Sequence, residues 1–298
     1  MTATPGAESP PADPGPRKLT VTDLAGMKAR GRRIAMVTAY DAPGARTAER
    51  AGVDVLLVGD SAAMVVLGHE STLPITLDEM VLLTRAVVRG APRTLVVADL
   101  PFGSYEVSDE VAVESAVRLV KDGGADLVKL EGAGARLARA RAIVEAGVAV
   151  MGHLGLTPQS ATQLGGYKAQ GLTASAARAL VEAAGALSQA GCSALVLEAM
   201  PAQVAAVITA RVRVPTFGIG AGPGCDGQVL VWHDLLGITE GPLPRFVRTY
   251  AALGHEMRRA LEAYVADVKS GAFPEARHTY TMPEAELKRF TAAIDAGG

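Results

Sequence analysis

Short apolar runs and amphipathic stretches alternate along the chain from residue 34 onward. Each apolar run is rich in β-branched residues and ends in a polar residue or in glycine, as VDVLLVGD (53–60) and ADLVKLEG (125–132) do. The stretches between them are rich in alanine. In 108–124, apolar residues recur at helical spacing, Ser108 provides an N-cap and a Gly-Gly pair provides a stop. The pattern predicts buried strands that alternate with covering helices.

Eight apolar runs qualify as strands. They are IAMVTAYD (34–41), VDVLLVGD (53–60), TLVVADLPF (94–102), ADLVKLEG (125–132), VAVMGHLG (148–155), CSALVLEAM (192–200), VPTFGIGAG (214–222) and VLVWHDLLGI (229–238). Helices are predicted between them, among others over 42–52 and 173–191. Eight such units in roughly 200 to 250 residues fit a closed barrel, so the predicted fold class is α/β, a (β/α)8 TIM barrel. An open doubly wound sheet is the alternative, but no GxGxxG follows the first strand.

The segments outside the barrel are predicted to be helical or disordered. A helix over 18–31 precedes the first strand and is expected to cover the N-terminal mouth of the barrel. Two more helices, over 254–269 and 283–295, follow the last strand. These elements predict one domain over residues 18–298 with a C-terminal helical extension. Residues 1–17, rich in Pro, Ala, Gly and Ser, are predicted to be a disordered tail.

Bulk composition narrows the classes of function. The 298 residues carry a formal net charge of -2, without the Lys and Arg surplus on which nucleic-acid affinity rests. No apolar run reaches the roughly 18 residues of a membrane span, and the N-terminus lacks a secretory signal. The two cysteines, Cys192 and Cys225, form no CxxC pair and suit core positions in a reducing compartment. We therefore expect a cytoplasmic protein with no nucleic-acid or membrane partner.

The polar ends of the strands hold the candidate chemistry. Catalytic groups of a (β/α)8 barrel lie at the carboxyl ends of the strands, so these ends are predicted to converge on one face. Four carboxylates, one lysine and one histidine stand there: Asp60, Asp99, Lys129, Glu131, His153 and Glu198. Each carboxylate alone could cap the helix that follows. Together they would repel unless a cation offsets them, and Lys129 offsets only part. An all-oxygen site favours Mg²⁺ over zinc.

Glu198 is predicted to differ from the other carboxylates. It stands between ALVL and AMP, so its sequence neighbours are the most apolar of the set. Desolvation is expected to raise its pKa toward the operating pH, as a general base requires. The other carboxylates, in polar company, are expected to stay ionised and bind metal. Lys129 has a second interpretation, as a lysine that forms a Schiff base with a carbonyl substrate.

Ten longer motifs carry a resemblance to a known family. In chain order they are VTAYDAPGA, LLVGDS, GHESTLPIT, ADLPFGSY, VKLEG, GHLGLTPQS, GGYKAQG, LVLEAMP, GIGAGPGCDGQVLV and HDLLGI, within residues 18 to 275. In this order and spacing the chain resembles the ketopantoate (3-methyl-2-oxobutanoate) hydroxymethyltransferase family. The resemblance implies a (β/α)8 barrel that requires Mg²⁺ and forms a homo-oligomer, a decamer in the family. It implies transfer of a one-carbon unit from 5,10-methylenetetrahydrofolate to 3-methyl-2-oxobutanoate, in pantothenate and coenzyme A biosynthesis.

The same resemblance implies roles for individual residues. Asp60 and Asp99 would hold Mg²⁺, with Glu131 completing the site through water. The keto acid would chelate the metal through its carboxylate and keto oxygens, so Asp60 and Asp99 would also belong to the substrate site. Ser61 and Lys129 would bind the carboxylate side of the substrate. His153 would line the pocket, and Glu198 would be the proton acceptor. One departure follows Ser61, where Ala-Ala replaces the usual Leu-Gly and could alter the loop over the substrate.

Two other functions compete with this interpretation. The phosphoenolpyruvate mutase and isocitrate lyase group also uses a Mg²⁺-bound keto acid in a barrel, but the KxCGH motif expected of the lyases is missing. A non-catalytic barrel that serves as a scaffold would not need the complete set of charged strand ends. The glycine-rich GIGAGPGCDG (218–227) could cradle phosphate, but the implied substrate carries none, so a tight turn near the folate or a subunit contact is expected there.

Overall fold

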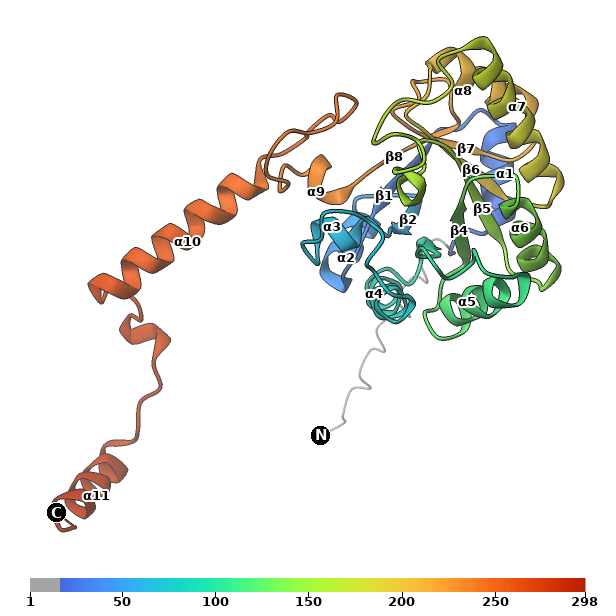
Figure 1. Cartoon of the computed structure of the whole chain (residues 1–298). Helices are drawn as coiled ribbons and strands as arrows, with labels where there is room; N and C mark the ends of the chain where they lie inside the picture. The colour runs from blue at the N-terminus through green and yellow to red at the C-terminus, as the bar shows by residue number, and fades with distance from the viewer. Residues whose placement is uncertain (1–16, 298) are drawn as a thin grey trace, which may run out of the picture.

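The computed structural model of the protein describes residues 17–297, so the predicted tail 1–17 lies, except for its last residue, outside the described residues. Eight parallel strands close into a barrel in sequence order, and the eighth pairs with the first (Figure 1). The strands are β1 (Ile34–Thr38), β2 (Val55–Val58), β3 (Leu95–Asp99), β4 (Leu127–Glu131), β5 (Val150–Gly155), β6 (Ala194–Glu198), β7 (Thr216–Ile219) and β8 (Gly227–Leu230). The fold is therefore an α/β TIM barrel, which confirms the predicted fold class.

Helices cover the outside of the barrel from β1 round to β7. They are α2 (Ala42–Arg50), α3 (Ala62–Val65), α4 (Leu77–Gly90), α5 (Asp109–Lys121), α6 (Arg136–Glu145), α7 (Ala174–Gln189) and α8 (Ala202–Arg211). The predicted cap of α5 is present, since Ser108 Oγ accepts a hydrogen bond from Val111 N at 3.2 Å. The inner faces of these helices and the outer faces of the strands form one buried apolar shell.

A second apolar cluster fills the inside of the barrel. It contains side chains from all eight strands, among them Met36, Leu57, Val97, Met151 and Phe217. The helix α1 (Val21–Ala29) adds Leu24 and Met27, which are 0% and 1% exposed. Helix α1 therefore closes the N-terminal mouth, as predicted, and the opposite end of the barrel is left for chemistry.

The eighth strand differs from its prediction over 229–238. The strand β8 is Gly227–Leu230, and Trp232–Leu235 forms a short helix, α9, instead. Trp232 N donates a hydrogen bond to Thr38 Oγ1 at 2.8 Å, which anchors this helix on the end of β1. The prediction was wrong here because a short apolar run suits a strand and a buried helical turn equally well.

Within residues 17–297, no helix covers the barrel wall at β8. The connection from β7 to β8, residues 220–226, contains no helix, and the chain after β8 runs away from the barrel (Figure 1). Ala35 on β1 and Gln228 on β8 are exposed in this wall. A pocket of about 400 Å³ hollows it, with Arg33 and Pro223 among its lining residues. The wall therefore presents a surface that a helix covers elsewhere in the barrel.

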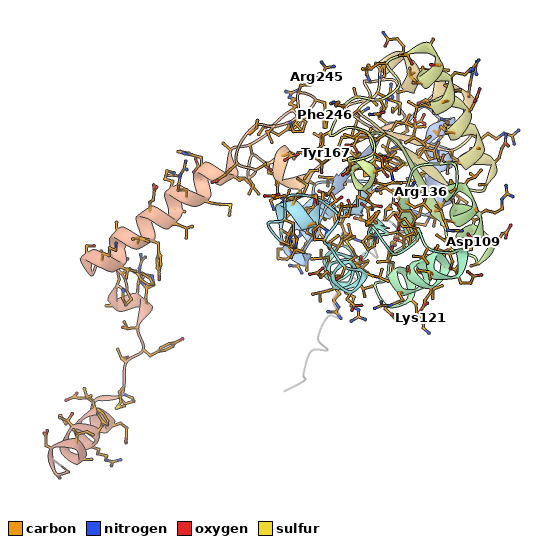
Figure 2. The ribbon with its side chains drawn as sticks, in the orientation of Figure 1. Asp109, Lys121, Arg136, Tyr167, Arg245 and Phe246 are labelled. Carbon is orange, nitrogen blue, oxygen red and sulfur yellow. The ribbon has the colours of Figure 1, made fainter. Side chains whose placement is uncertain are left out.

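The C-terminal segment extends away from the barrel as an arm, which we define as residues 253–297. It contains α10 (Leu253–Ser270), a 3-10 turn η2 (Ala276–His278) and α11 (Glu284–Asp295), so both predicted C-terminal helices are present. Side chains of the arm stand clear of the barrel (Figure 2). Exposed apolar residues line one stripe of α10: Leu253, Met257, Leu261, Tyr264, Val265 and Val268. None of the helices in the described part of the chain is long and apolar enough to cross a membrane.

Candidate active site

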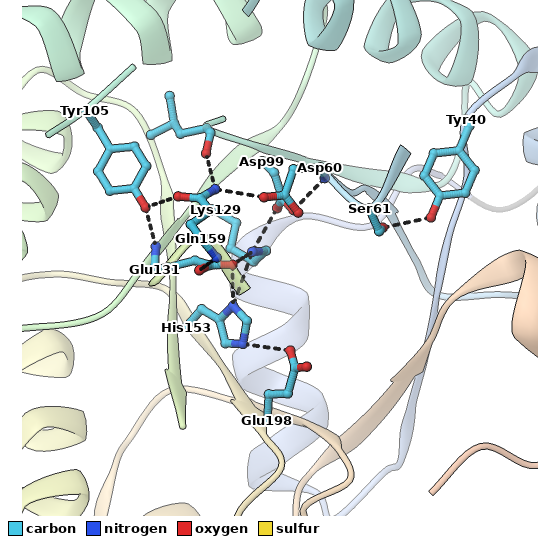
Figure 3. Close-up of polar contacts among 11 residues, drawn as sticks. Tyr40, Asp60, Ser61, Asp99, Tyr105, Lys129, Glu131, His153, Gln159 and Glu198 are labelled. Carbon is cyan, nitrogen blue, oxygen red and sulfur yellow. Dashed lines mark hydrogen bonds and ion pairs between the residues drawn. The ribbon is translucent and has the colours of Figure 1, made fainter. Parts of the chain in front are cut away.

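The six predicted polar side chains meet at the C-terminal end of the barrel. They come from the ends of five neighbouring strands, β2 to β6, because parallel strands place their carboxyl ends on one rim. Figure 3 shows the cluster and its contacts. The side chains of Lys129, Glu131 and His153 are 4%, 2% and 4% exposed, whereas that of Glu198 is 15% exposed. The structure thus brings together all six, in a site almost closed to water.

Lys129 is the central cation of the cluster. Its Nζ lies 3.2 Å from Asp99 Oδ1 and 3.9 Å from Glu131 Oε1. The backbone N of Asp60 donates a hydrogen bond to Asp99 Oδ2 at 3.0 Å, which ties the end of β2 to the end of β3. Burial works against the charge of Lys129, but the surrounding carboxylates raise its pKa above the ordinary lysine value, so the amine stays protonated.

The carboxylates at β2 and β3 remain short of positive charge. Burial raises the pKa of Asp60 well above its usual range, the charges of Asp99 and Glu131 raise it further, and Lys129 offsets only part. Burial also raises the pKa of Asp99, against the lowering effect of Lys129. That these carboxylates stay ionised by binding metal remains a prediction, and their burial favours the uptake of a further cation or a proton.

His153 lies between two carboxylates from neighbouring strands. Its Nδ1 is 3.4 Å from Glu131 Oε1, and its Nε2 is 3.1 Å from Glu198 Oε2. Burial and Lys129 lower the pKa of this imidazole, yet the nearby carboxylates of Glu131 and Glu198 outweigh them and raise it to about 9. His153 is therefore an imidazolium at neutral pH. The expectation that Glu198 has apolar surroundings is wrong, since its carboxylate faces this charged ring.

Three further side chains complete the site, and none belongs to the predicted set of metal ligands, base and substrate-binding residues. The Tyr40 hydroxyl, at the end of β1, shares a hydrogen bond of 2.9 Å with Ser61 Oγ. Gln159, in the turn η1 (Pro158–Ser160) after β5, donates from Nε2 to Asp60 Oδ2 at 2.8 Å. The hydroxyl of Tyr105 donates to Gln159 Oε1. These groups are neutral, and the charge pattern of the sequence gave no signal for them. Their only sequence signal is a position just after a strand.

The donor set at β2 and β3 fits a hard divalent cation. Asp60 and Asp99 are adjacent and buried, and apart from its ion pair with Lys129, Asp99 Oδ1 has no hydrogen-bond partner within residues 17–297. Mg²⁺ binds through one or two carboxylates and retains water or substrate oxygens as its other ligands. No group of three or more ligand side chains is preassembled in the described part of the chain. Glu131 is expected to complete the site only through water, and its Oε2 is already occupied by a hydrogen bond from Gln159 N at 3.0 Å.

Comparison with solved structures gives the fold class. The structure of 2,3-dimethylmalate lyase, a member of the PEP mutase/isocitrate lyase superfamily, is similar with a TM-score of 0.56 at 19% identity, covering 94% of this chain and 100% of that one. Phosphonopyruvate hydrolase gives a TM-score of 0.58 at 11% identity, covering 93% and 98%. At these identities the likeness concerns the fold alone. Fold and cluster together define a (β/α)8-barrel protein with a carboxylate-rich C-terminal face.

Comparison of sequences gives the family. A model of the family "Ketopantoate hydroxymethyltransferase" matches residues 18–276. The 3-methyl-2-oxobutanoate hydroxymethyltransferase of Moorella thermoacetica is 56% identical over 263 residues, covering 88% of this chain and 98% of the relative. The enzyme of Oryza sativa subsp. japonica named 3-methyl-2-oxobutanoate hydroxymethyltransferase 1, mitochondrial, is 52% identical over 289 residues, covering 95% and 79%. The chain belongs to the ketopantoate hydroxymethyltransferase family, and it is a transferase of pantothenate biosynthesis.

Proposed function

We propose that the protein transfers a hydroxymethyl group from 5,10-methylenetetrahydrofolate to 3-methyl-2-oxobutanoate and produces 2-dehydropantoate, with Mg²⁺ as the required cation. The observation that carries the proposal is the buried pair Asp60 and Asp99, which lies beside Lys129 on the catalytic face and is short of positive charge. Family membership supplies the reaction class. Structural likeness to the lyase and mutase group supports only a shared barrel and does not favour their chemistry.

The binding groups suit a small keto acid. Asp60 and Asp99 would hold the cation, with Glu131 completing the site through water. A cation held there supplies Lewis-acid polarisation of the keto group. Lys129, protonated and fixed by two carboxylates, attracts the carboxylate of the substrate, and Ser61 offers a hydroxyl that Tyr40 orients. His153 lines the same pocket as a charged ring.

Glu198 is the proposed base. The reaction needs a proton removed from C3, next to the ketone, so that the C3–H electron pair can form a bond to the methylene carbon of the folate as one of its two C–N bonds breaks. Water then supplies the hydroxyl oxygen to the same carbon as the second C–N bond breaks. Tetrahydrofolate leaves with both nitrogen electron pairs, and its nitrogens take up the C3 proton and one proton of water. Glu198 sits at the rim with a 15% exposed side chain, and His153 Nε2 holds its carboxylate at 3.1 Å. Such a position suits a carboxylate that must reach a substrate carbon.

The Schiff-base alternative for Lys129 is disfavoured by its surroundings. An amine attacks a carbonyl only when it is unprotonated. Here three carboxylates hold the pKa of Lys129 above its ordinary value, against the effect of burial. Borohydride treatment in the presence of the keto acid is expected to leave Lys129 unmodified, and a covalent adduct on Lys129 would support the imine instead.

Two assays test the proposed reaction. Hydroxymethyl transfer to 3-methyl-2-oxobutanoate should depend on both the folate and Mg²⁺ and should stop when a chelator is added. Exchange of the C3 proton into D₂O, followed by NMR without folate, isolates the step assigned to Glu198. Glu198→Gln should abolish this exchange while the variant remains folded. Near-normal exchange in that variant would remove Glu198 from the role of base.

We further propose that the protein forms a homo-oligomer in which the arm of one copy covers another copy. The apolar stripe of α10 is exposed, and α11 adds Leu287, Phe290 and Ile294, which are 49%, 56% and 62% exposed. The uncovered wall at β8 lacks the helix that such a stripe would supply. A decamer is the expected size from the family resemblance. Removal of residues 253–298 should shift the mass measured by light scattering to a smaller species.

We also propose a domain division and a cellular location. Residues 18–298 form a single domain, and residues 1–17 form a tail that precedes it. A cytoplasmic location stays a prediction, and the rice relative carries the word mitochondrial in its name. Fractionation of the native host, with an antibody to the protein, tests the compartment.

A further inference from the structure

Gln159 is a buried amide whose polar atoms are all engaged. The residue is 5% exposed. Its Nε2 donates to Asp60 Oδ2 at 2.8 Å and to the Leu100 carbonyl oxygen at 2.9 Å. Its Oε1 accepts from the hydroxyl of Tyr105, and its backbone N donates to Glu131 Oε2 at 3.0 Å. A single residue thus contacts two carboxylates that come from different strands (Figure 3).

The partners of Gln159 fix the orientation of its amide. Nε2 faces the Leu100 carbonyl oxygen, which can only accept, and an oxygen of the Asp60 carboxyl group. A flipped amide would place its oxygen against both. The amide oxygen is therefore turned toward Tyr105 and away from Asp60, so Gln159 is not itself a ligand of a cation bound there.

The hydroxyl of Tyr105 links Glu131 to Gln159, and its donor and acceptor roles are fixed. Its side chain is 0% exposed, and its hydroxyl accepts from Glu131 N at 3.3 Å while donating to Gln159 Oε1. Since this hydroxyl has one hydrogen, the acceptor role toward Glu131 N and the donor role toward Gln159 are both settled. The loop after β3 and the turn after β5 thereby hold the ends of β2 and β4 in one arrangement.

We infer that Gln159 and Tyr105 are positioning residues for the cation site, because they fix Asp60 and Glu131 before any cation binds. The inference rests on the proposed function, which assigns the cation to these carboxylates. Gln159 occupies one oxygen of each carboxylate with a neutral donor, so the carboxylates are ordered without losing charge. Partners that orient metal ligands in this way typically contribute roughly 10- to 100-fold to metal affinity.

Binding of Mn²⁺ alone to the full chain tests the inference, since free Mn²⁺ is counted directly by electron paramagnetic resonance. The variants are Gln159→Met, which keeps the length and loses every hydrogen bond of the side chain, and Tyr105→Phe, which loses only the hydroxyl. The matched control is Ser104→Ala. Ser104 is buried beside Tyr105 in the same loop, and its Oγ donates to the Pro101 carbonyl at 2.7 Å, with no carboxylate contact. Thermal melting without metal reports the fold of each variant.

The expected Kd for Mn²⁺ rises roughly 10- to 100-fold in Gln159→Met and about 2- to 10-fold in Tyr105→Phe, while Ser104→Ala stays within about twofold of the unmodified protein. Unchanged affinity in the folded Gln159 and Tyr105 variants would overturn the inference, as would an equal loss in the Ser104 control. If Gln159→Met does not fold, Tyr105→Phe decides alone. If the unmodified protein binds no Mn²⁺, the cation assignment of the proposed function fails, and the inference falls with it.

Discussion

Lys129→Met would remove the one ammonium in the cluster while keeping most of the volume of its stem. The ammonium lies 3.2 Å from Asp99 Oδ1 and 3.9 Å from Glu131 Oε1, with a 4% exposed side chain. At an effective dielectric constant of about 20 these two attractions are about 5 and 4 kcal/mol. Desolvation of the lysine offsets part of them, and breaking a buried pair typically costs about 3–5 kcal/mol. We expect the free energy of unfolding to fall by about 3–5 kcal/mol at pH 8.

The loss of unfolding free energy in Lys129→Met should grow as pH rises. Burial has already raised the pKa of Asp60 above its unfolded value of 3.8, and Lys129 contributes the largest lowering effect, ahead of the hydrogen bond from Gln159. A carboxyl whose folded pKa is raised destabilises the fold above that pKa, where it is charged, and the penalty disappears as pH falls through it. The deficit of Lys129→Met should therefore be larger at pH 8 than at pH 5. Added Mg²⁺ should restore part of it.

Urea unfolding at one fixed protein concentration measures this prediction, because subunit association also contributes to stability. Lys18→Met is the matched control: Lys18 forms an ion pair with Asp126 at 2.6 Å, with the two side chains 30% and 29% exposed. Such a partly exposed pair contributes about 0–1 kcal/mol. A loss below about 1 kcal/mol in Lys129→Met at pH 8, or a deficit that grows toward pH 5, would refute the charge reasoning.

Four further substitutions or reagents test other features. Gly155 has φ +100°, and a Cβ there would meet the Glu198 carbonyl oxygen, so Gly155→Ala should lower the melting temperature and the activity. Gly185, in α7 with nothing near its Cβ, should instead gain about 0.4–1 kcal/mol on mutation to alanine. Burial raises the pKa of Cys192 to about 12, and Cys225 is also buried, so neither thiol should react with Ellman's reagent at pH 8 before unfolding. The pKa of His153 is raised from 6.5 to about 9, so its stabilisation is complete below about 6.5 and lost as pH rises through 9. The stability gap between the unmodified protein and His153→Gln should narrow over that range, and a widening gap would contradict the ion pairs.

The barrel and the position of its site were predictable from local sequence because strand ends must share one rim. Asp60, Asp99 and Glu131 each follow an apolar run, and parallel pairing in sequence order alone brings them together. The error at β8 arose where this local signal is weakest, since Gly227 begins the strand and carries no hydrophobic signal. A Cβ at Gly227 would lie 2.6 Å from the Ile34 carbonyl oxygen, so the residue is set by packing against β1.

The surroundings of Glu198 could not be predicted from its sequence neighbours. The apolar residues beside it in the chain alternate between the barrel interior and the helix layer, whereas its neighbours across the sheet come from β5 and β7. In the register of β5 and β6, Gly155 pairs with Glu198 and His153 pairs with Val196. A glycine opposite Glu198 leaves room for the nearby imidazole to reach the carboxylate. The environment of the proposed base therefore depends on the register between β5 and β6, which pairs residues far apart in the chain.

The geometry of the cluster and the balance of its charges are separate properties. The side chains of the protein fix the geometry, but they leave the negative charge only partly compensated. Four carboxylates face one ammonium and one imidazolium, so the fully ionised cluster carries an excess of negative charge. Gln159 and Tyr105 hold the geometry with neutral hydrogen bonds, which fix oxygens in place but cancel no charge. A buried, ordered and undercompensated pair such as Asp60 and Asp99 gains most from a divalent cation, because little reorganisation remains when the cation arrives. This is why the neutral neighbours of the cluster, as well as its charged members, should control cation affinity.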